Sequence, residues 1–98
     1  MQYIYQPYIK DQPVSSLICY NKIEDALESA MTVIRYENGP RDATVCEPVE
    51  IEKPQNCPWY VCKVFKVRIL NELFDEGTGV CDVSDDIEYI LIKQMTLY

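Results

Sequence analysis

The chain has 98 residues, 48% of them hydrophobic and 26% charged, with nine Lys and Arg, 16 Asp and Glu, and no histidine. This length fits one domain, residues 1–98, and the apolar fraction is high enough for a folded core. The missing imidazole excludes Ser-His-Asp and Cys-His catalysis and histidine metal ligation. The formal net charge of −7 disfavours direct nucleic-acid binding through phosphate neutralisation.

The cysteines and the N-terminus predict a cytoplasmic chain. No apolar run is long enough for a membrane-spanning helix, and the first residues lack the basic and apolar regions of a secretory signal. Without a signal, an odd number of cysteines indicates reduced thiols in a cytosol. These five residues are Cys19, Cys46, Cys57, Cys62 and Cys81.

Residues 1–13 predict an edge strand or an arm. Tyr and Ile favour strands, and Pro7 and Pro13 restrict a strand to an edge. The tyrosines Tyr3, Tyr5 and Tyr8 belong either to this short strand or to a partner-binding arm, since tyrosine is enriched at interfaces. An edge strand could also pair with its symmetry mate in a homodimer.

The next segment predicts a short buried strand over residues 16–20 and an amphipathic helix over 22–37. Asn21 is the expected N-cap, with Glu24 returning a capping-box bond. We expect Gly39, which can take a positive φ, and the proline after it to end the helix. One helix face is apolar: Ile23, Ala26, Leu27, Ala30, Met31 and Ile34.

The second half of the chain predicts three strands. Residues 45–52 alternate as an edge strand, residues 59–70 give the longest strand pattern, and 87–97 are apolar on both faces, which is typical of a central strand. The acidic residues 71–86 between the last two are expected to form a loop. The order β-β-α-β-β-β predicts an α+β domain with one helix on a mostly antiparallel sheet of four or five strands.

Charge is concentrated in two neighbouring segments. Residues 58–71 carry three cations and no anion, and residues 72–98 carry seven anions and one cation. The acidic cluster is either a solvated loop or a docking surface for a basic partner. As the docking surface it would comprise Asp75, Glu76, Asp82, Asp85, Asp86 and Glu88, with Tyr3, Tyr5, Tyr8 and Trp59 as apolar anchors.

The basic strand residues Lys63, Lys66 and Arg68 have two interpretations. They can pair with acidic residues on neighbouring strands, or they can hold a small anionic ligand such as a nucleotide. The spacing of Cys57 and Cys62 lies at the edge of the range for zinc pairs, but Cys62 falls inside a strand pattern and neither Cys46 nor Cys81 has a close cysteine partner. The acidic residues do not match a calcium loop, so no metal and no cofactor is expected. No group of residues in the sequence matches the pattern of a known catalytic site. We therefore expect a protein that is not an enzyme.

The segment Ser16-Leu-Ile-Cys-Tyr-Asn-Lys-Ile-Glu-Asp-Ala-Leu-Glu-Ser-Ala-Met31 resembles the strand, cap and helix of small phage-encoded accessory proteins. Some members of that group inhibit bacterial defence systems, including CRISPR nucleases. The resemblance implies an inhibitor in the cytoplasm of a bacterial host, which docks an acidic surface onto a basic site of a host defence or nucleic-acid-handling protein. The alternative expectation is a nucleotide-sequestering protein that uses the basic strand.

Overall fold

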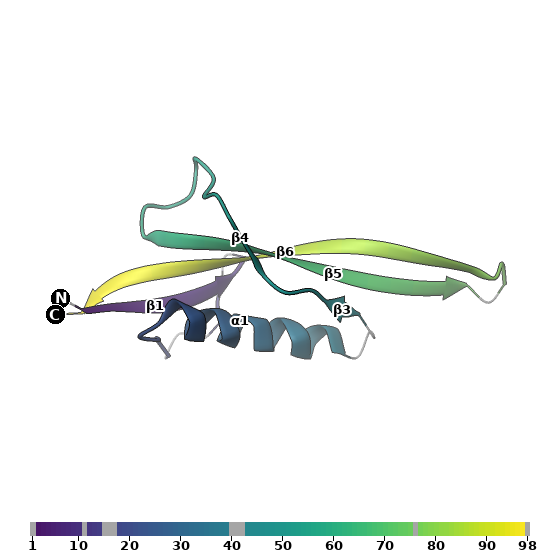
Figure 1. Cartoon of the computed structure of the whole chain (residues 1–98), viewed down its shortest axis with the longest axis horizontal. Helices are drawn as coiled ribbons and strands as arrows, with labels where there is room; N and C mark the ends of the chain where they lie inside the picture. The colour runs from purple at the N-terminus through teal and green to yellow at the C-terminus, as the bar shows by residue number, and fades with distance from the viewer. Residues whose placement is uncertain (1, 11, 15–17, 40–42, 76, 98) are drawn as a thin grey trace.

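The computed structural model describes residues 2–10, 12–14, 18–39, 43–75 and 77–97, without the side chains of 72–75, 80–83 and 97. One helix packs on an antiparallel sheet, which confirms the predicted α+β class (Figure 1). The elements in chain order are β1 (Gln2–Ile9), β2 (Gln12–Pro13), α1 (Ile23–Asn38), β3 (Thr44–Val45), β4 (Val49–Ile51), β5 (Val61–Asp75) and β6 (Val80–Leu97).

The strand order in the sheet is β2-β1-β6-β5-β3, and β4 also pairs with β5. β6 therefore lies centrally between β1 and β5, as its apolar faces predict. The predicted edge strand 45–52 is divided into β3 and β4, which pair with β5 on the side away from β6. Pro48 lies in the interruption, where a residue without an N–H cannot extend a ladder.

β1 is a true strand that pairs with β6 along its whole length. Its carbonyl group at Pro7 accepts a hydrogen bond from the N–H of Val14 at 3.0 Å. The position of the missing proline N–H therefore faces away from β6. Pro7 thus removes no hydrogen bond from the ladder between β1 and β6. β2 covers only the second half of this outer edge.

Helix α1 begins at Ile23, one residue later than expected, and Lys22 is the N-cap residue without a side-chain cap bond. The prediction of an Asn21 cap is therefore wrong, because Asn21 precedes the cap and Glu24 falls too early for a capping box. The helix ends at Asn38 with Gly39 as its C-cap residue, as expected. Gly39 does not use the positive φ open to glycine: its φ is −56°, and its N–H bonds to the Arg35 carbonyl. The following proline lies outside the described residues.

The apolar run 16–20 does not form a buried strand. Residues 16 and 17 lie outside the described part of the chain, and Ile18 is 51% exposed. Only Tyr20 joins the sheet, through two backbone hydrogen bonds with Tyr5 of 2.7 and 2.8 Å. Helix α1 begins three residues after Tyr20, so the chain leaves the sheet after this single backbone bridge.

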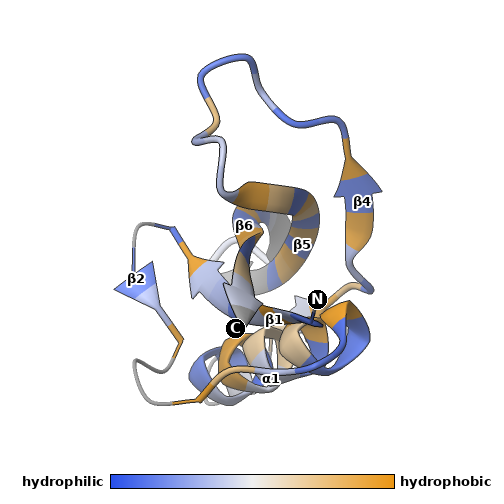
Figure 2. Ribbon diagram, turned by 90° about the vertical axis from the view of Figure 1, so that its left-hand side faces the viewer, coloured by the Kyte–Doolittle hydropathy of each residue, from blue (hydrophilic) through white to orange (hydrophobic). Residues whose placement is uncertain are grey.

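The main core lies between α1 and one face of the sheet. Figure 2 shows the helix on this side and the β4–β5 loop on the other. The buried cluster consists of Ala26, Ala30, Met31, Ile34, Phe65, Val67, Ile69, Ile90 and Ile92. Its helical members are four of the six residues in the predicted apolar face, and burial of that stripe holds the two layers together.

The acidic segment 71–86 is not a loop. β5 and β6 stay paired from Asn71·Ser84 to Asp75·Val80, and the turn contains Gly79 with a φ of +70°. The ladder uses backbone groups, so it continues where the side chains no longer alternate between polar and apolar. The two-stranded ribbon extends beyond α1 and gives the molecule its dimensions of 61 × 28 × 19 Å (Figure 1).

Candidate functional site

The first candidate surface is the hairpin arm, defined here as residues 71–86. It carries six carboxylates and no cation in the sequence: Glu72, Asp75, Glu76, Asp82, Asp85 and Asp86. The arm projects from the end of the sheet opposite the chain termini (Figure 1). Asp75, Glu76 and Asp82 lie outside the described side chains, so the structure places only the backbone of Asp75 and Asp82, in the β5–β6 ladder.

An ion pair holds the arm at its base. Arg68 donates to Asp85 from Nε, 3.2 Å from Oδ2, and from Nη2, 2.7 Å from the same oxygen. The two residues lie diagonally across β5 and β6 on one sheet face. The guanidinium lowers the pKa of the Asp85 carboxyl below its ordinary value, and Asp85 raises the pKa of Arg68. This geometry matches the cross-strand interpretation of Arg68.

Two further predicted acidic residues have partners near the arm base. Asn71 Nδ2 donates to Asp86 Oδ2 at 2.8 Å. Lys10 Nζ lies 3.6 Å from Glu88 Oε1, and the other Glu88 carboxylate oxygen is buried without a hydrogen-bond partner among the described residues. The carboxylates next to the sheet are thus partly neutralised, and the arm's remaining acidic residues lie closer to its turn.

The predicted aromatic anchors do not gather around the arm. Tyr3 is exposed on β1 near the chain termini, while Tyr5 packs against the core. The Tyr8 hydroxyl lies 3.5 Å from Gln6 Oε1. Trp59 is 92% exposed at the start of β5, where its ring meets Tyr60 edge-on. Tyr3, which pairs with Thr96, and Trp59, beside the Tyr60 that bonds to Gln94, therefore lie toward the end of the sheet away from the arm. Tyr8 instead pairs with Leu91, three residues from Glu88.

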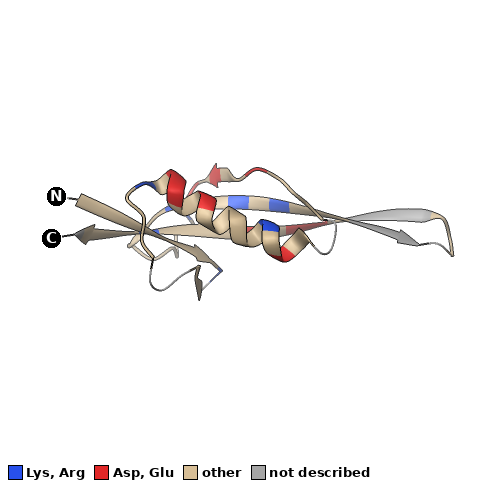
Figure 3. Ribbon diagram, turned by 90° about the horizontal axis from the view of Figure 1, so that it is seen from below, with Lys and Arg blue, Asp and Glu red and all other residues tan. Residues whose placement is uncertain are grey.

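The three basic strand residues do not converge on one point. Lys63 pairs opposite Ile92 of the core face and donates to Glu50 Oε1 at 2.8 Å, which raises its pKa. Lys66 and Arg68 alternate onto the opposite, helix-free face. Figure 3 shows the Lys and Arg positions of the long strands within the part of the sheet that α1 crosses. With Lys63 and Arg68 in ion pairs, an anion would have to compete with carboxylates that are already bound.

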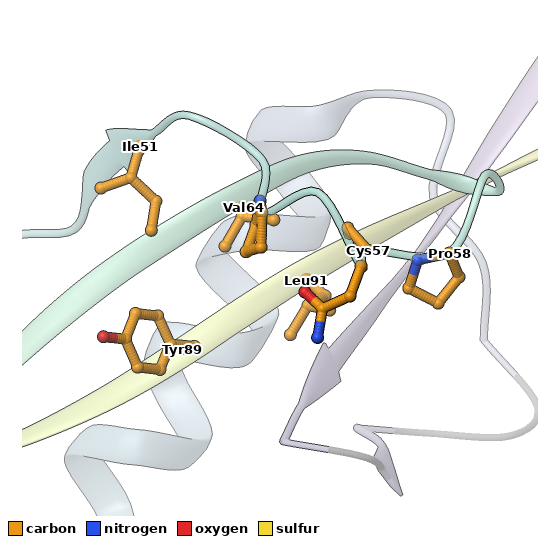
Figure 4. Close-up of a pocket in the computed structure, with 8 residues that line it drawn as sticks. Ile51, Cys57, Pro58, Val64, Tyr89 and Leu91 are labelled. Atoms are coloured by element: carbon orange, nitrogen blue, oxygen red, sulfur yellow. The ribbon is translucent and has the colours of Figure 1, made fainter.

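A second candidate surface is an apolar cavity of about 440 Å³ on the helix-free face, which the sequence analysis missed. The β4–β5 loop closes over the sheet here, so Val64 is only 3% exposed although it faces away from α1. Figure 4 shows Cys57 and Pro58 of this loop beside the strand residues Val64 and Leu91. The lining consists of Ile51, Pro54, Asn56, Cys57, Pro58, Val64, Tyr89 and Leu91.

One sequence signal could have indicated this cavity. Residues 89–92 are apolar on both faces, a pattern that by itself predicts only a central strand position. A strand can be apolar on both faces because each face is covered. Here α1 covers Ile90 and Ile92, while the loop partly covers Leu91. The cavity volume lies within the range of small-ligand sites.

The described cysteines present no metal or redox constellation. Cys19, Cys46, Cys57 and Cys62 are free thiols. Burial raises the pKa of the Cys62 thiol, which keeps it protonated and a poor nucleophile. Within the described residues no group of three or more Cys, Asp or Glu side chains is arranged to hold a metal ion. In that same part of the chain, no helix is long and apolar enough to cross a bilayer.

Comparison of the chain with protein-family models, with curated proteins and with solved structures gives no match.

Proposed function

We propose that the chain is a non-enzymatic interaction protein whose hairpin arm docks onto a basic surface of a partner protein. The observation that carries this proposal is the projection of a two-stranded arm with six carboxylates and no cation in its sequence. An isolated two-stranded ribbon is only marginally stable in water, so we expect contact with a partner to stabilise the arm. We expect the target to be a basic site of a host defence or nucleic-acid-handling protein, and the chain to act there as an inhibitor.

Charge is the physical basis of the proposed recognition. A projecting acidic element accelerates encounter with a basic cleft and selects against acidic competitors. The ion pairs of Arg68 and Lys10 lie at the arm base. The proposed contact therefore relies on the acidic residues nearer the turn in the sequence, Asp75, Glu76 and Asp82. The anchors Tyr3 and Trp59 lie too far along the sheet to contribute to the same small contact, so the proposal rests on the arm alone.

The experiment compares two triple variants with equal charge changes. The arm variant is Asp75→Asn/Glu76→Gln/Asp82→Asn. The control is Asp25→Asn/Glu37→Gln/Glu52→Gln, whose exposed side chains make no ion pair within the described residues. Tagged wild-type protein captures a partner from a bacterial lysate at two salt concentrations. The affinity of each variant for the purified partner is then measured across salt concentrations.

We expect the arm variant to lose about tenfold or more in affinity and to show a weaker salt dependence. The control should stay within about twofold of wild type, because rim charges far from a contact change affinity little. Equal losses in both variants would show a non-specific charge effect and would contradict the proposal.

The nucleotide-binding alternative is not favoured by any contact in the structure, since its three cations point to two faces. A thermal-shift screen against nucleotides tests it directly. A stabilisation of several degrees that disappears in Lys66→Ala would restore that alternative.

A further inference from the structure

The arm has one long strand edge that the rest of the sheet leaves open. β1 pairs with β6 only from Ile90 onward, and the Lys10 N–H reaches the Tyr89 carbonyl at 3.5 Å. Toward the turn, over residues 84–88, no described strand pairs with this outer edge of β6. An unpaired edge is a template for an added strand.

The register identifies which backbone groups face outward. The Cys46 N–H bonds to the Arg68 carbonyl at 2.9 Å, so Arg68 directs its backbone groups toward β3 and away from β6. Arg68 pairs with Ile87, which must then direct its own N–H and carbonyl away from β5. Tyr89, two residues later, has the same orientation, because its carbonyl accepts a hydrogen bond from the Lys10 N–H on the outer side of β6. By alternation, Asp85 and Ile87 present the open hydrogen-bonding groups.

The side chains beside this edge define the chemistry of an occupant. On the helix-free face, Ile87 and Tyr89 are 43% and 45% exposed, an apolar pair next to the open edge. On the other face, Asp86 and Glu88 place two carboxylates. A strand added here would bury an apolar side chain against Ile87. Its cations would lie beside the two carboxylates, in addition to Asn71 at Asp86 and Lys10 at Glu88.

A second copy of this chain fits the edge poorly. Two β6 edges paired over 84–88 would bring Asp85, Asp86 and Glu88 of each copy beside those of the other. Like charges directly opposite each other destabilise a strand pair. Charge complementarity instead favours a segment whose Lys or Arg residues alternate with apolar residues.

We propose that an extended segment of the partner, with alternating basic and apolar residues, adds to β6 as a strand over residues 84–88. This inference rests on the proposed docking function of the arm and specifies its mode. Backbone hydrogen bonds to Asp85 and Ile87 supply register-dependent binding, and the alternating side chains supply selectivity. The distal carboxylates then attract the segment but do not position it.

The test uses a fluorescent decapeptide of five Lys-Val repeats at low salt, together with the same peptide N-methylated at its four central residues. Both peptides have equal charge, but the second cannot form a ladder. Fluorescence polarisation measures affinity, and hydrogen exchange of the ¹⁵N-labelled protein follows the Asp85 and Ile87 amides. Ile87→Pro removes an outward N–H, and Ile87→Thr, a β-branched control, retains it.

We expect the N-methylated peptide and Ile87→Pro each to weaken binding about tenfold or more, and Ile87→Thr to weaken it less than about threefold. The two outward amides should exchange more slowly when the unmethylated peptide is bound. Equal affinity for both peptides would overturn strand addition while leaving charge-based docking intact. Failure of both peptides to bind would also overturn it, and the docking function would then be judged by the purified-partner experiment.

Discussion

Arg68 and Asp85 show that a cross-strand partner changes how a charged residue is interpreted functionally. In the sequence, Arg68 belongs to a basic segment and Asp85 to an acidic one, and each suggests a separate binding surface. The β5–β6 register places them on one face with a guanidinium nitrogen 2.7 Å from the carboxylate. The two side chains therefore bind each other first, and as charged groups they are weaker candidates for contact with a partner than the acidic residues nearer the turn.

The lowered pKa of Asp85 predicts a pH-dependent contribution to stability. A carboxyl whose pKa is lower in the folded state stabilises the fold above its ordinary value of 3.8 and loses this effect as the pH falls through the folded-state pKa. Wild type should therefore be more stable than Asp85→Asn near pH 7, and the difference should shrink in acid. Urea unfolding at both pH values measures it.

The Arg68→Met background provides the control for that experiment. Because the guanidinium is the main cause of the shift, Asp85→Asn should have little effect in this background at either pH. A stability difference between wild type and Asp85→Asn that is the same in acid and at neutral pH would contradict the assignment.

At the scale of elements, α1 and the β5–β6 hairpin are stabilised in different ways. α1 begins without a side-chain cap bond, so its position depends on the apolar stripe that it buries against β5 and β6. Helices in proteins gain most of their stability from such packing rather than from local propensity. The hairpin arm, in contrast, extends past the helix and depends on its ladder of backbone hydrogen bonds.

Two truncations on the same helix test this account of α1. Ile34 is almost completely buried in the core, while Tyr36 is exposed two residues later. Ile34→Ala should lower the free energy of unfolding by about 2–5 kcal/mol, since it removes buried methyl groups and leaves a cavity. Tyr36→Ala should change it by less than about 0.5 kcal/mol. Chemical denaturation of both variants measures the contrast, and similar losses would contradict the assigned helix face.

At the scale of the molecule, the arm makes the protein elongated. The Cα radius of gyration is 16.1 Å, whereas a compact domain of this length is expected near 13 Å. Little of this shape comes from the core, whose described residues lie between α1 and the part of the sheet that α1 crosses. A projecting arm and a stable two-layer base are thus separate parts of one small chain.

Small-angle scattering tests the elongated shape with a matched variant. Replacing residues 73–82 by Asn-Gly joins the paired residues Glu72 and Val83 through a two-residue hairpin turn. Wild type should scatter with a radius of gyration close to the Cα value, and the shortened chain should approach about 13 Å. Equal radii for the two proteins would show that the arm does not extend in solution.

The sequence by itself determined the two-layer α+β base. Periodic burial of Ala26, Ala30, Met31 and Ile34 specifies one helix face, and the apolar strands specify a sheet that must cover it. It also placed β6 centrally and confined residues 45–52 to an edge. These features could be predicted because each follows from local periodicity or from the missing N–H of a proline.

Only the tertiary structure decided the rest. The acidic segment 71–86 was expected to be a loop, but the pairing of β5 with β6 continues from Asn71 and Ser84 toward the turn. Such backbone pairing does not depend on hydrophobic alternation. The fold likewise separated Trp59 from the acidic residues and closed a loop over Val64 to form the cavity. Long-range register places these groups, and it is a property of the whole sheet that no single segment encodes.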